Sequence, residues 1–349
     1  MRRPTISTRG PRRGLVALAG VSLALASCSI PIMALSASGE PSLSLGAPLT
    51  SVACTTSGAC IALGASGSAT APTTAAQVRN HKGVWSALHV PSAPVASFDA
   101  SSCAATRCLF GGTGQNGDLL WSIDANTGAL RQKAGPAGGL VIRNLSCPSD
   151  LACYAVDQAA HSLTRFSFTT NAGSTWSAPR TLAWAAQGTT GLECVSTQRC
   201  FVASSSPRHI VSLRETLNRG VTWTVVKTPA TWRSLQALQC ANACTALVGS
   251  ATGSDIATQS TTPATNKVPA TTIWTTTPIK FHASAVACAG ISSCLIVGSA
   301  DTHAAMAQWQ AGVVHPVALT YVPSALTGVA CEPSACVAIG VSTVVALRP

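Results

Sequence analysis

The sequence predicts an all-β fold, a seven-bladed β-propeller whose last blade is closed by strands from both ends of the chain. All but one of its 15 cysteines fall into seven close pairs, and the first members of successive pairs recur at intervals of 43 to 49 residues. Alternating apolar segments flank each pair. A fixed period of this length is typical of a four-stranded propeller blade, so seven copies predict seven blades.

The seven cysteine pairs are predicted to be disulfides. In each repeat an apolar segment runs into the first cysteine, and the second opens another after a short polar loop, as in a β-hairpin. A bridge across the hairpin mouth needs Cα atoms about 5.5 Å apart. Zinc ligation, the alternative, needs shorter spacings and a reducing compartment. The predicted bridges are Cys54–Cys60, Cys103–Cys108, Cys147–Cys153, Cys194–Cys200, Cys240–Cys244, Cys288–Cys294 and Cys331–Cys336.

The N-terminus has the features of an export signal. The first 27 residues carry five arginines and no acid, and an uncharged run begins at Gly14. Leu25-Ala26-Ser27-Cys28 resembles the lipobox of bacterial lipoproteins, and Cys28 is the cysteine without a nearby mate. Cleavage near Ala37 and an uncleaved anchor are the alternatives. A twin-arginine route, which carries folded proteins, fits less well because disulfides do not form in a reducing cytosol.

The predicted organisation is therefore a signal peptide over 1–27, a tether over 28–40 and the propeller over 41–349. We expect an extracytoplasmic protein, held to the membrane by a lipid on Cys28 and monomeric. After removal of the signal, 17 basic residues face 11 acidic ones, and no basic run remains. This composition excludes a nucleic-acid partner.

Two segments share a turn motif, [Ser/Thr]-x-[Asp/Asn]-x-Gly-x-Thr-Trp, at 169–176 and 216–223. The motif resembles the Asp box of sialidase-like, or BNR-repeat, propellers, which forms the hairpin between the third and fourth strands of a blade. We expect asparagine in this turn because it tolerates the left-handed conformation and bonds its own backbone. We expect the glycines to supply positive φ and the tryptophans to pack between blades. The residues concerned are Asn171, Gly173, Trp176, Asn218, Gly220 and Trp223.

Other turn phrases extend the resemblance over about residues 40 to 349. Residues 80–85 are a degenerate copy of the motif, and 121–130 look like the repeat of quinoprotein-type propellers. The cysteine phrase is similar to repeats of secreted actinobacterial proteins. Only 18 residues follow Cys331, so the fourth strand of the last blade is expected from Ser42–Gly46. Such closure removes an open sheet edge.

The sequence favours a binding module over an enzyme. A sialidase needs an arginine cluster and a tyrosine–glutamate pair, whereas Tyr154 and Tyr321 lack acidic neighbours in sequence. Asp boxes are structural in that family and give no evidence of hydrolysis. No Gly-x-Ser-x-Gly elbow or His-x-x-x-His spacing occurs, and no cofactor or metal is expected. The alternatives are a glycan-acting hydrolase or lyase of sialidase-like fold, and an assembly factor similar to Asp-box propellers that help build photosystem II.

Propeller topology predicts where a ligand binds. First-to-second and third-to-fourth strand loops share one face, so disulfides and Asp boxes occupy the same face and leave the opposite one for a glycan or a protein or peptide ligand. Scattered surface polarity and packing of the tryptophans between blades are the alternatives. The candidate binding residues are Trp184, Trp232, Arg233, Asp157, His161, His209, Asp301 and His303, with Asp118, Arg208 and Asp255 in the same loops.

Overall fold

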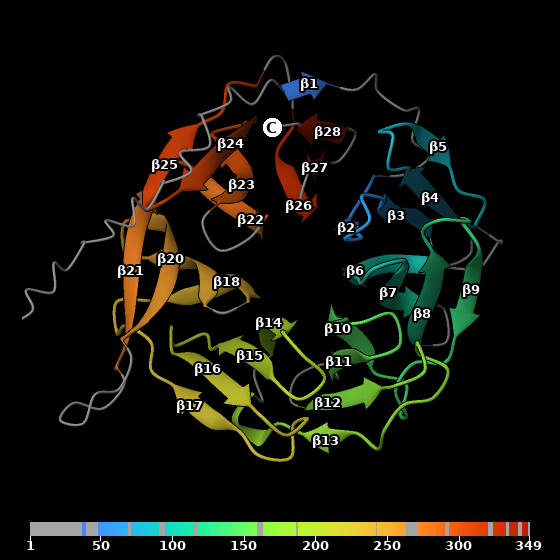
Figure 1. Ribbon diagram of the computed structural model, residues 1–349, viewed down its shortest axis with the longest axis horizontal. Coiled ribbons are helices and arrows are strands. Elements are labelled where there is room, and N and C mark those ends of the chain that lie inside the picture. Colours follow the sequence, from blue (N-terminus) through green and yellow to red (C-terminus); the bar gives the residue numbers. More distant parts are fainter. Residues whose placement is uncertain are drawn as a thin grey trace, which may run out of the picture. The chain divides into compact units, whose positions relative to one another are not determined.

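The computed structural model contains seven antiparallel four-stranded sheets arranged as a ring around a central axis (Figure 1). This confirms the predicted fold class and the number of blades. The structure describes residues 37–39, 48–68, 71–90, 95–114, 117–158, 163–185, 188–241, 243–262, 271–289, 293–319, 324–332, 335–340 and 344–347. Within these ranges no helix has the length and apolar character needed to cross a bilayer.

Blades 1 to 4 follow each other along the chain, each from its innermost to its outermost strand. Blade 1 is β2 (Ser51–Cys54), β3 (Cys60–Ser68), β4 (Ala71–Arg79) and β5 (Trp85–Ala87). Blade 2 is β6 (Val95–Cys103), β7 (Arg107–Gly114), β8 (Gly117–Asp124) and β9 (Leu130–Lys133). Blade 3 is β10 (Val141–Ser146), β11 (Cys153–Gln158), β12 (Thr164–Thr169) and β13 (Arg180–Thr181). Blade 4 is β14 (Thr189–Cys194), β15 (Cys200–Ser205), β16 (Val211–Thr216) and β17 (Thr224–Val226), preceded by the short 3-10 helix η1 (Ala183–Ala185).

Blades 5 and 6 repeat the same order, and blade 7 combines the two chain ends. Blade 5 is β18 (Ser234–Cys240), β19 (Cys244–Ser250), β20 (Gly253–Thr262) and β21 (Thr271–Ile279). Blade 6 is β22 (His282–Cys288), β23 (Ser293–Ala300), β24 (His303–Gln310) and β25 (Val313–Pro316). Blade 7 is β26 (Leu326–Glu332), β27 (Ala335–Gly340), β28 (Val344–Leu347) and β1 (Ala37–Gly39).

Blade 7 is closed by an N-terminal strand, as predicted, but by a different segment. The outermost strand β1 pairs antiparallel with β28, with Ser38 opposite Ala346. The segment expected in this place, Ser42–Gly46, lies outside the described residues, and the closing strand comes from upstream of it. Pairing β1 with β28 covers the edge that the last C-terminal strand would otherwise expose.

All seven predicted disulfides are present, each within one blade. In six blades the bridged cysteines are direct cross-strand partners at the mouth of the first hairpin. Their Cα atoms are 3.9 to 4.0 Å apart, closer than the expected separation. The difference arises because directly opposed residues of a non-hydrogen-bonded pair approach more closely than a hydrogen-bonded pair.

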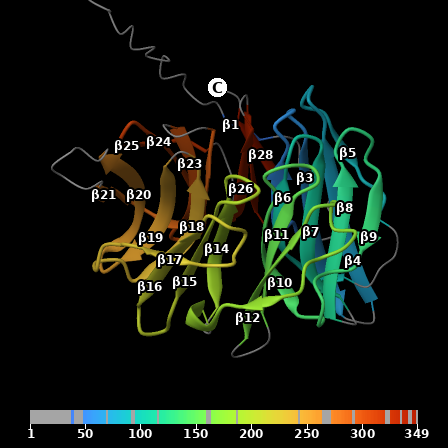
Figure 2. The same ribbon diagram turned by 60° about the horizontal axis from the view of Figure 1, so that its bottom comes forward.

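The hydrophobic core is divided into clusters that lie between neighbouring blades. Between blades 2 and 3, Leu109 and Leu120 pack against Ile142 and Ala155. Between blades 3 and 4, Tyr154 and the residues around it pack against strands of the next sheet. Each sheet buries both faces in this arrangement, which explains the short, strongly apolar second strands of the repeat. The strands run between two faces of the ring, on which the loops lie (Figure 2).

Candidate functional site

The disulfides and the strand 3–strand 4 turns lie on the same face, as predicted. In blade 3 the amide of Ala172, in the turn, donates to the carbonyl of Leu151, in the disulfide loop, over 2.9 Å. In blade 4 the amide of Arg219 donates to the carbonyl of Gln198 over 3.1 Å. We call this the disulfide face. The opposite face carries the strand 2–strand 3 hairpins and the connections between blades.

The turns at 169–176 and 216–223 have the same hydrogen bonds. In the turn at 216–223, Asn218 Oδ1 accepts hydrogen bonds from the backbone amide of Thr222 and from the hydroxyl of Thr216. The Thr216 hydroxyl oxygen in turn accepts a hydrogen bond from the amide of Gly220. Asn171, Thr175, Thr169 and Gly173 repeat this arrangement in blade 3.

The asparagines do not themselves adopt the left-handed conformation. Positive φ falls on Ala172 and Arg219, with 55° and 57°, and on the glycines that follow. The side-chain oxygens of the asparagines do accept hydrogen bonds from the backbone of their own turns, as predicted. The tryptophans do pack between blades: Trp223 meets Phe166 edge-on at 5.3 Å, and Trp176 donates from Nε1 to the carbonyl of Ala134.

A ring of polar residues occupies the opposite end of the innermost strands. In six blades the residue four positions before the first cysteine is an unpaired bulge residue, and in blade 1 Thr50 takes the same position. β-bulges re-aim side chains and are common at the rims of barrels and beside functional sites. We call these residues the bulge ring. They are Thr50, Asp99, Arg143, Thr190, Gln236, Ser284 and Thr327.

The contacts of the bulge ring differ from one side of the ring to the other. Arg143 and Asp99, from adjacent blades, form an exposed ion pair at 3.0 Å. In contrast, Thr190 Oγ1 and Gln236 Oε1, in blades 4 and 5, are buried and have no hydrogen-bond partner among the described residues. Buried polar atoms normally have a partner, so these two oxygens are candidates for contact with a ligand or an ordered water.

A cavity of about 390 Å³ adjoins the bulge ring at Gln236, between blades 5 and 6. Its size lies within the range of small-ligand sites, roughly 300 to 1,000 Å³. The exposed side chains of Lys280 and His282 come from the connection between the blades and the start of β22. The remaining lining residues are Thr252, Gly253, Ser254, Ile279 and Phe281.

The innermost strand of blade 4 carries an unusual carboxyl group, that of Glu193. Burial raises the pKa of Glu193 to about 8. Residues at the equivalent position in other blades, such as Ser146 and Gln239, accept a hydrogen bond from the amide of the next blade's first cysteine. Within the described residues the carboxyl group of Glu193 forms no hydrogen bond or ion pair. It is therefore held as the neutral acid near neutral pH.

The two tryptophans expected to be exposed are packed against other side chains. Trp232 is buried, with 3% of its surface exposed, and its ring meets that of Trp274 at 4.9 Å. Trp184 is half-buried between Trp223, 5.9 Å away, and the guanidinium of Arg214, 4.8 Å from its ring centroid. Packing between blades therefore decides their position, because large aromatic rings fill the gaps between sheets.

Asp157 is also enclosed. Its carboxylate accepts two hydrogen bonds from Arg165, at 2.7 and 3.0 Å, and the residue is 1% exposed. Asp118 lies near it across the seam between blades 2 and 3, and its pKa is raised by burial and by the charge of Asp157. The blade connection at Gly135 and Gly138 runs directly against Asp118 and Arg165. These carboxylates are thus part of a covered ion-pair cluster.

The remaining candidates lie in loops of more than one blade, with Asp301 and His303 in the same hairpin of blade 6. Arg233, His209, Asp301 and His303 are exposed, and His209 and Asp301 have positive φ in tight turns. Arg208 is exposed and Asp255 half-buried. His161 and Cys28 lie outside the described residues. Neither the cavity at Gln236 nor a second one on blade 2 is lined by these side chains.

Tyr154 does not lie in a sialidase-type site. Tyr154 is buried, donates from its hydroxyl to the carbonyl of Thr197 over 2.6 Å, and so links blades 3 and 4 on the disulfide face. Burial raises the pKa of its hydroxyl. Tyr321 lies outside the described residues.

No family model and no curated protein matches this chain. Solved structures resemble it in fold. YCF48 bound to a D1 peptide has a TM-score of 0.64 at 12% identity, covering 91% of this chain and 97% of that one. Catalytically inactive virginiamycin B lyase from Staphylococcus aureus with quinupristin has 0.62 at 11%, covering 90% and 99%. A GH74 xyloglucanase from Xanthomonas campestris has 0.61 at 14%, covering 89% of this chain and 53% of that one.

At these identities the likeness shows the propeller fold alone. The neighbours include a protein with a bound peptide, a lyase and a hydrolase, so the fold is compatible with more than one kind of function.

The bulge ring was missed by the sequence reasoning, although a signal for it was present. The residue four positions before the first cysteine is polar in all seven repeats. The sequence does not show that this residue lies in a β-bulge, and the bulge is what removes it from strand pairing and leaves its side chain available for other contacts. The cavity beside Gln236 has no comparable signal, because its lining comes from three separate segments of the chain, in two blades.

Proposed function

We propose that this protein is a non-catalytic binding propeller of the cell envelope, and that it holds a peptide or protein segment on the face opposite the disulfides. The observation that carries the proposal is the joining of the bulge ring to the cavity between blades 5 and 6 at Gln236. Gln236 at the cavity, and Thr190 elsewhere in the bulge ring, have buried side-chain oxygens that lack hydrogen-bond partners in the described part of the chain. Peptide N–H groups are suitable donors for such oxygens.

The character of the cavity supports a peptide segment as the occupant. Gln236 and Ser254 offer hydrogen-bonding groups, Phe281 and Ile279 offer apolar surface, and Lys280 supplies a positive charge. Ligand sites are commonly apolar with a few well-placed polar groups that fix orientation. A peptide with an acidic side chain or a free carboxyl terminus suits this set.

The proposal includes the attachment of the protein to the membrane. The basic, acid-free N-terminus and the lipobox-like Leu25–Cys28 support cleavage before Cys28 and a lipid on that residue. The structural disulfides support an oxidising, extracytoplasmic location.

We also propose that the turns at 169–176 and 216–223 are Asp boxes of the sialidase-like type.

Peptide and glycan arrays probed with the exported protein test the binding function. We expect acidic peptides to bind, and Gln236→Ala and Lys280→Ala to weaken binding roughly 10-fold each, as for the loss of a buried or charged hydrogen bond. Lys227→Ala, at an exposed lysine beyond the outer strand of blade 4, is the matched control and keeps full binding. Peptide binding that is unchanged in both cavity variants, or binding of glycans alone, contradicts the proposal.

Attachment is tested separately by metabolic labelling with an alkyne fatty acid. The wild-type protein is expected to incorporate the label and to fractionate with membranes, and Cys28→Ser to lose both. Labelling that persists in Cys28→Ser contradicts the lipid assignment without affecting the binding proposal.

A further inference from the structure

A second cavity, of about 240 Å³, lies on the flank of blade 2 that faces blade 3. Its polar lining consists of three cationic side chains, one carboxylate and one hydroxyl. They are Arg107, Arg131, Lys133, Asp124 and Ser122. The cavity is separate from the bulge ring and from the cavity between blades 5 and 6.

Strand register places these side chains on one side of the sheet. Three cross-strand pairs are involved: Arg107 lies opposite Asp124, Ser122 lies opposite Arg131, and Leu120 lies opposite Lys133. Leu120 belongs to the core between blades 2 and 3, so its face of the sheet points toward blade 3. From blade 3, Ser174 accepts a hydrogen bond from Lys133 Nζ at 3.0 Å. The cavity is therefore a groove between two blades.

The acidic groups near the groove are already engaged. Asp124 Oδ1 accepts hydrogen bonds from the amides of Asn126 and Thr127, and the bond from Thr127 is the main cause of its lowered pKa. Asp150 of blade 3 accepts from Thr106 and from the amide of Arg107. Three cations thus face two carboxylates, both of which accept bonds from other groups.

The cationic groups, in contrast, are largely free. The guanidinium groups of Arg107 and Arg131 form no hydrogen bond or ion pair within the described residues. Guanidinium groups present several N–H donors in a planar fork suited to oxyanions. The groove therefore has unused donors and an excess of positive charge.

Blade 4 provides an internal comparison. Arg199 precedes the second cysteine of that blade, as Arg107 does in blade 2, and pairs with Glu215 at 2.6 Å. In blade 4 the residue after the second cysteine, Phe201, lies opposite Glu215. In blade 2 the equivalent residue, Leu109, lies opposite Ser122, so Ser122 is the counterpart of Glu215. Blade 2 thus has a serine where blade 4 has the neutralising carboxylate.

The outer strands strengthen this contrast. Opposite Glu215 in blade 4 lies Thr224, whereas opposite Ser122 in blade 2 lies Arg131. Two positions further along, blade 4 has Val226 and blade 2 has Lys133. Compared with the same surface of blade 4, blade 2 has gained two cations, and its carboxylate lies at Asp124, where blade 4 has Leu217, instead of at the position of Ser122.

We propose that the groove between blades 2 and 3 binds a small tetrahedral oxyanion, a phosphate or sulfate group, through Arg107, Arg131 and Lys133. The floor hydroxyl of Ser122 donates to the same anion. The cavity is smaller than the roughly 300 Å³ at which drug-sized ligand sites begin, so it takes one anionic group and not an extended ligand.

Calorimetric titration of the full exported protein with inorganic phosphate, inorganic sulfate and glycerol phosphate tests this site. Phosphate or sulfate is expected to bind at low ionic strength and to weaken as sodium chloride is raised. Tighter binding of glycerol phosphate than of inorganic phosphate indicates an ester as the source of the anion, and the reverse order indicates the free ion.

Two variants at one position separate charge from shape. Ser122→Glu recreates the pairing that blade 4 shows, and Ser122→Gln adds the same bulk without the charge. Ser122→Glu is expected to bind the anion at least 10-fold more weakly than Ser122→Gln. Arg131→Ala is expected to weaken binding about 10-fold, as for a lost charged hydrogen bond. Thermal unfolding of each variant verifies the fold. Absence of binding by the wild-type protein, or equal affinities of Ser122→Glu and Ser122→Gln, overturns the proposal.

Discussion

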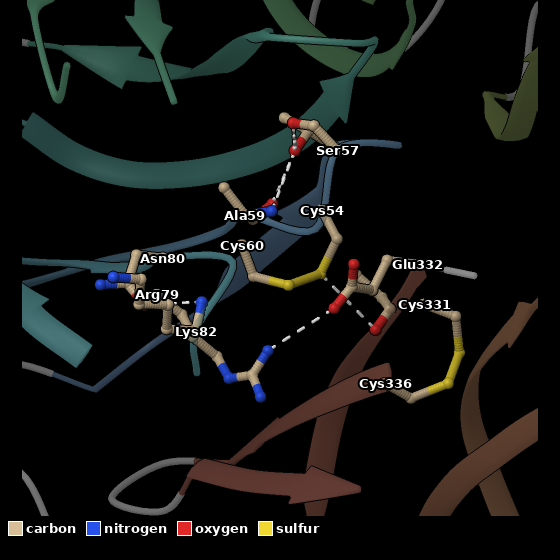
Figure 3. A network of polar contacts seen from close by, with 12 residues as sticks. Cys54, Ser57, Ala59, Cys60, Arg79, Asn80, Lys82, Cys331, Glu332 and Cys336 are labelled. Carbon is tan, nitrogen blue, oxygen red and sulfur yellow. Dashed lines mark hydrogen bonds and ion pairs between the residues drawn. A yellow bond between two sulfur atoms is a disulfide. The ribbon is translucent and has the colours of Figure 1, made fainter. Parts of the chain in front are cut away.

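Arg79 and Glu332 form a buried ion pair across the seam where blade 7 meets blade 1, with Arg79 Nη1 3.6 Å from Glu332 Oε1 (Figure 3). Their side chains are only 3% and 5% exposed. The pair lies beside two disulfides, and the Sγ atom of Cys54 is 3.8 Å from the carbonyl oxygen of Ala330 in blade 7. The seam that closes the ring is therefore held by a charge pair in addition to apolar packing.

Removing one partner of this pair is expected to destabilise the ring. Glu332→Gln leaves the arginine buried without a counter-charge, which costs about 3 to 5 kcal/mol. Urea unfolding of the oxidised protein measures the change. The double variant Arg79→Met/Glu332→Met is the control and is expected to recover most of the stability, because a buried pair contributes little over apolar residues of similar volume. Equal losses in the single and double variants contradict the charge-pair explanation.

Glu193 is expected to make stability depend on pH. Its folded-state pKa of about 8 lies above the ordinary value of 4.5, so the folded protein retains a proton that the unfolded chain releases. Its contribution to stability is complete below about pH 4.5 and is lost as pH rises through about 8. Glu193→Gln is expected to flatten the dependence of stability on pH between these values. Parallel pH curves for the wild type and the variant would contradict this.

The closing strand is expected to protect the edge of blade 7. Ser38→Pro removes a backbone donor within β1, which interrupts pairing with β28 around Ala346. We expect a lower melting temperature and concentration-dependent association in light scattering, because the edge of β28 becomes available. Ser38→Ala is the control. An unchanged melting temperature in Ser38→Pro would show that β1 contributes little to closure.

Gly220 is expected to be intolerant of any side chain. It has a φ of 76°, and a Cβ atom there would lie 2.5 Å from Phe166 Cε1, within the core between blades 3 and 4. Gly220→Ala is expected to cost about 1 to 2 kcal/mol for the left-handed backbone and about 1 to 3 kcal/mol for the collision. Gly312, with a φ of 92° and open space, is the matched site, so Gly312→Ala shows the backbone cost alone. Equal losses at the two sites in thermal unfolding would rule out the collision.

The sequence was sufficient to predict features that depend on local repetition. The cysteine period predicts seven blades, the hairpin pattern predicts seven disulfides, and the shortage of chain after Cys331 predicts closure by the N-terminus. Each of these follows from strand pairing between segments near each other in the repeat, or from counting strands. The identity of the closing segment was not predictable, because Ala37–Gly39 has no pattern that distinguishes it from the residues after it.

The candidate site depended on tertiary structure. Trp232 and Asp157 were expected at a ligand surface, but packing between sheets buries the first and an ion pair with Arg165 encloses the second. The bulge ring, the cationic groove and the Arg79–Glu332 pair each bring together residues from different strands or blades. A repeat sequence specifies what one blade contains, whereas the contacts between blades depend on which faces meet when the ring closes, and those contacts decided what is exposed, charged or free to bind.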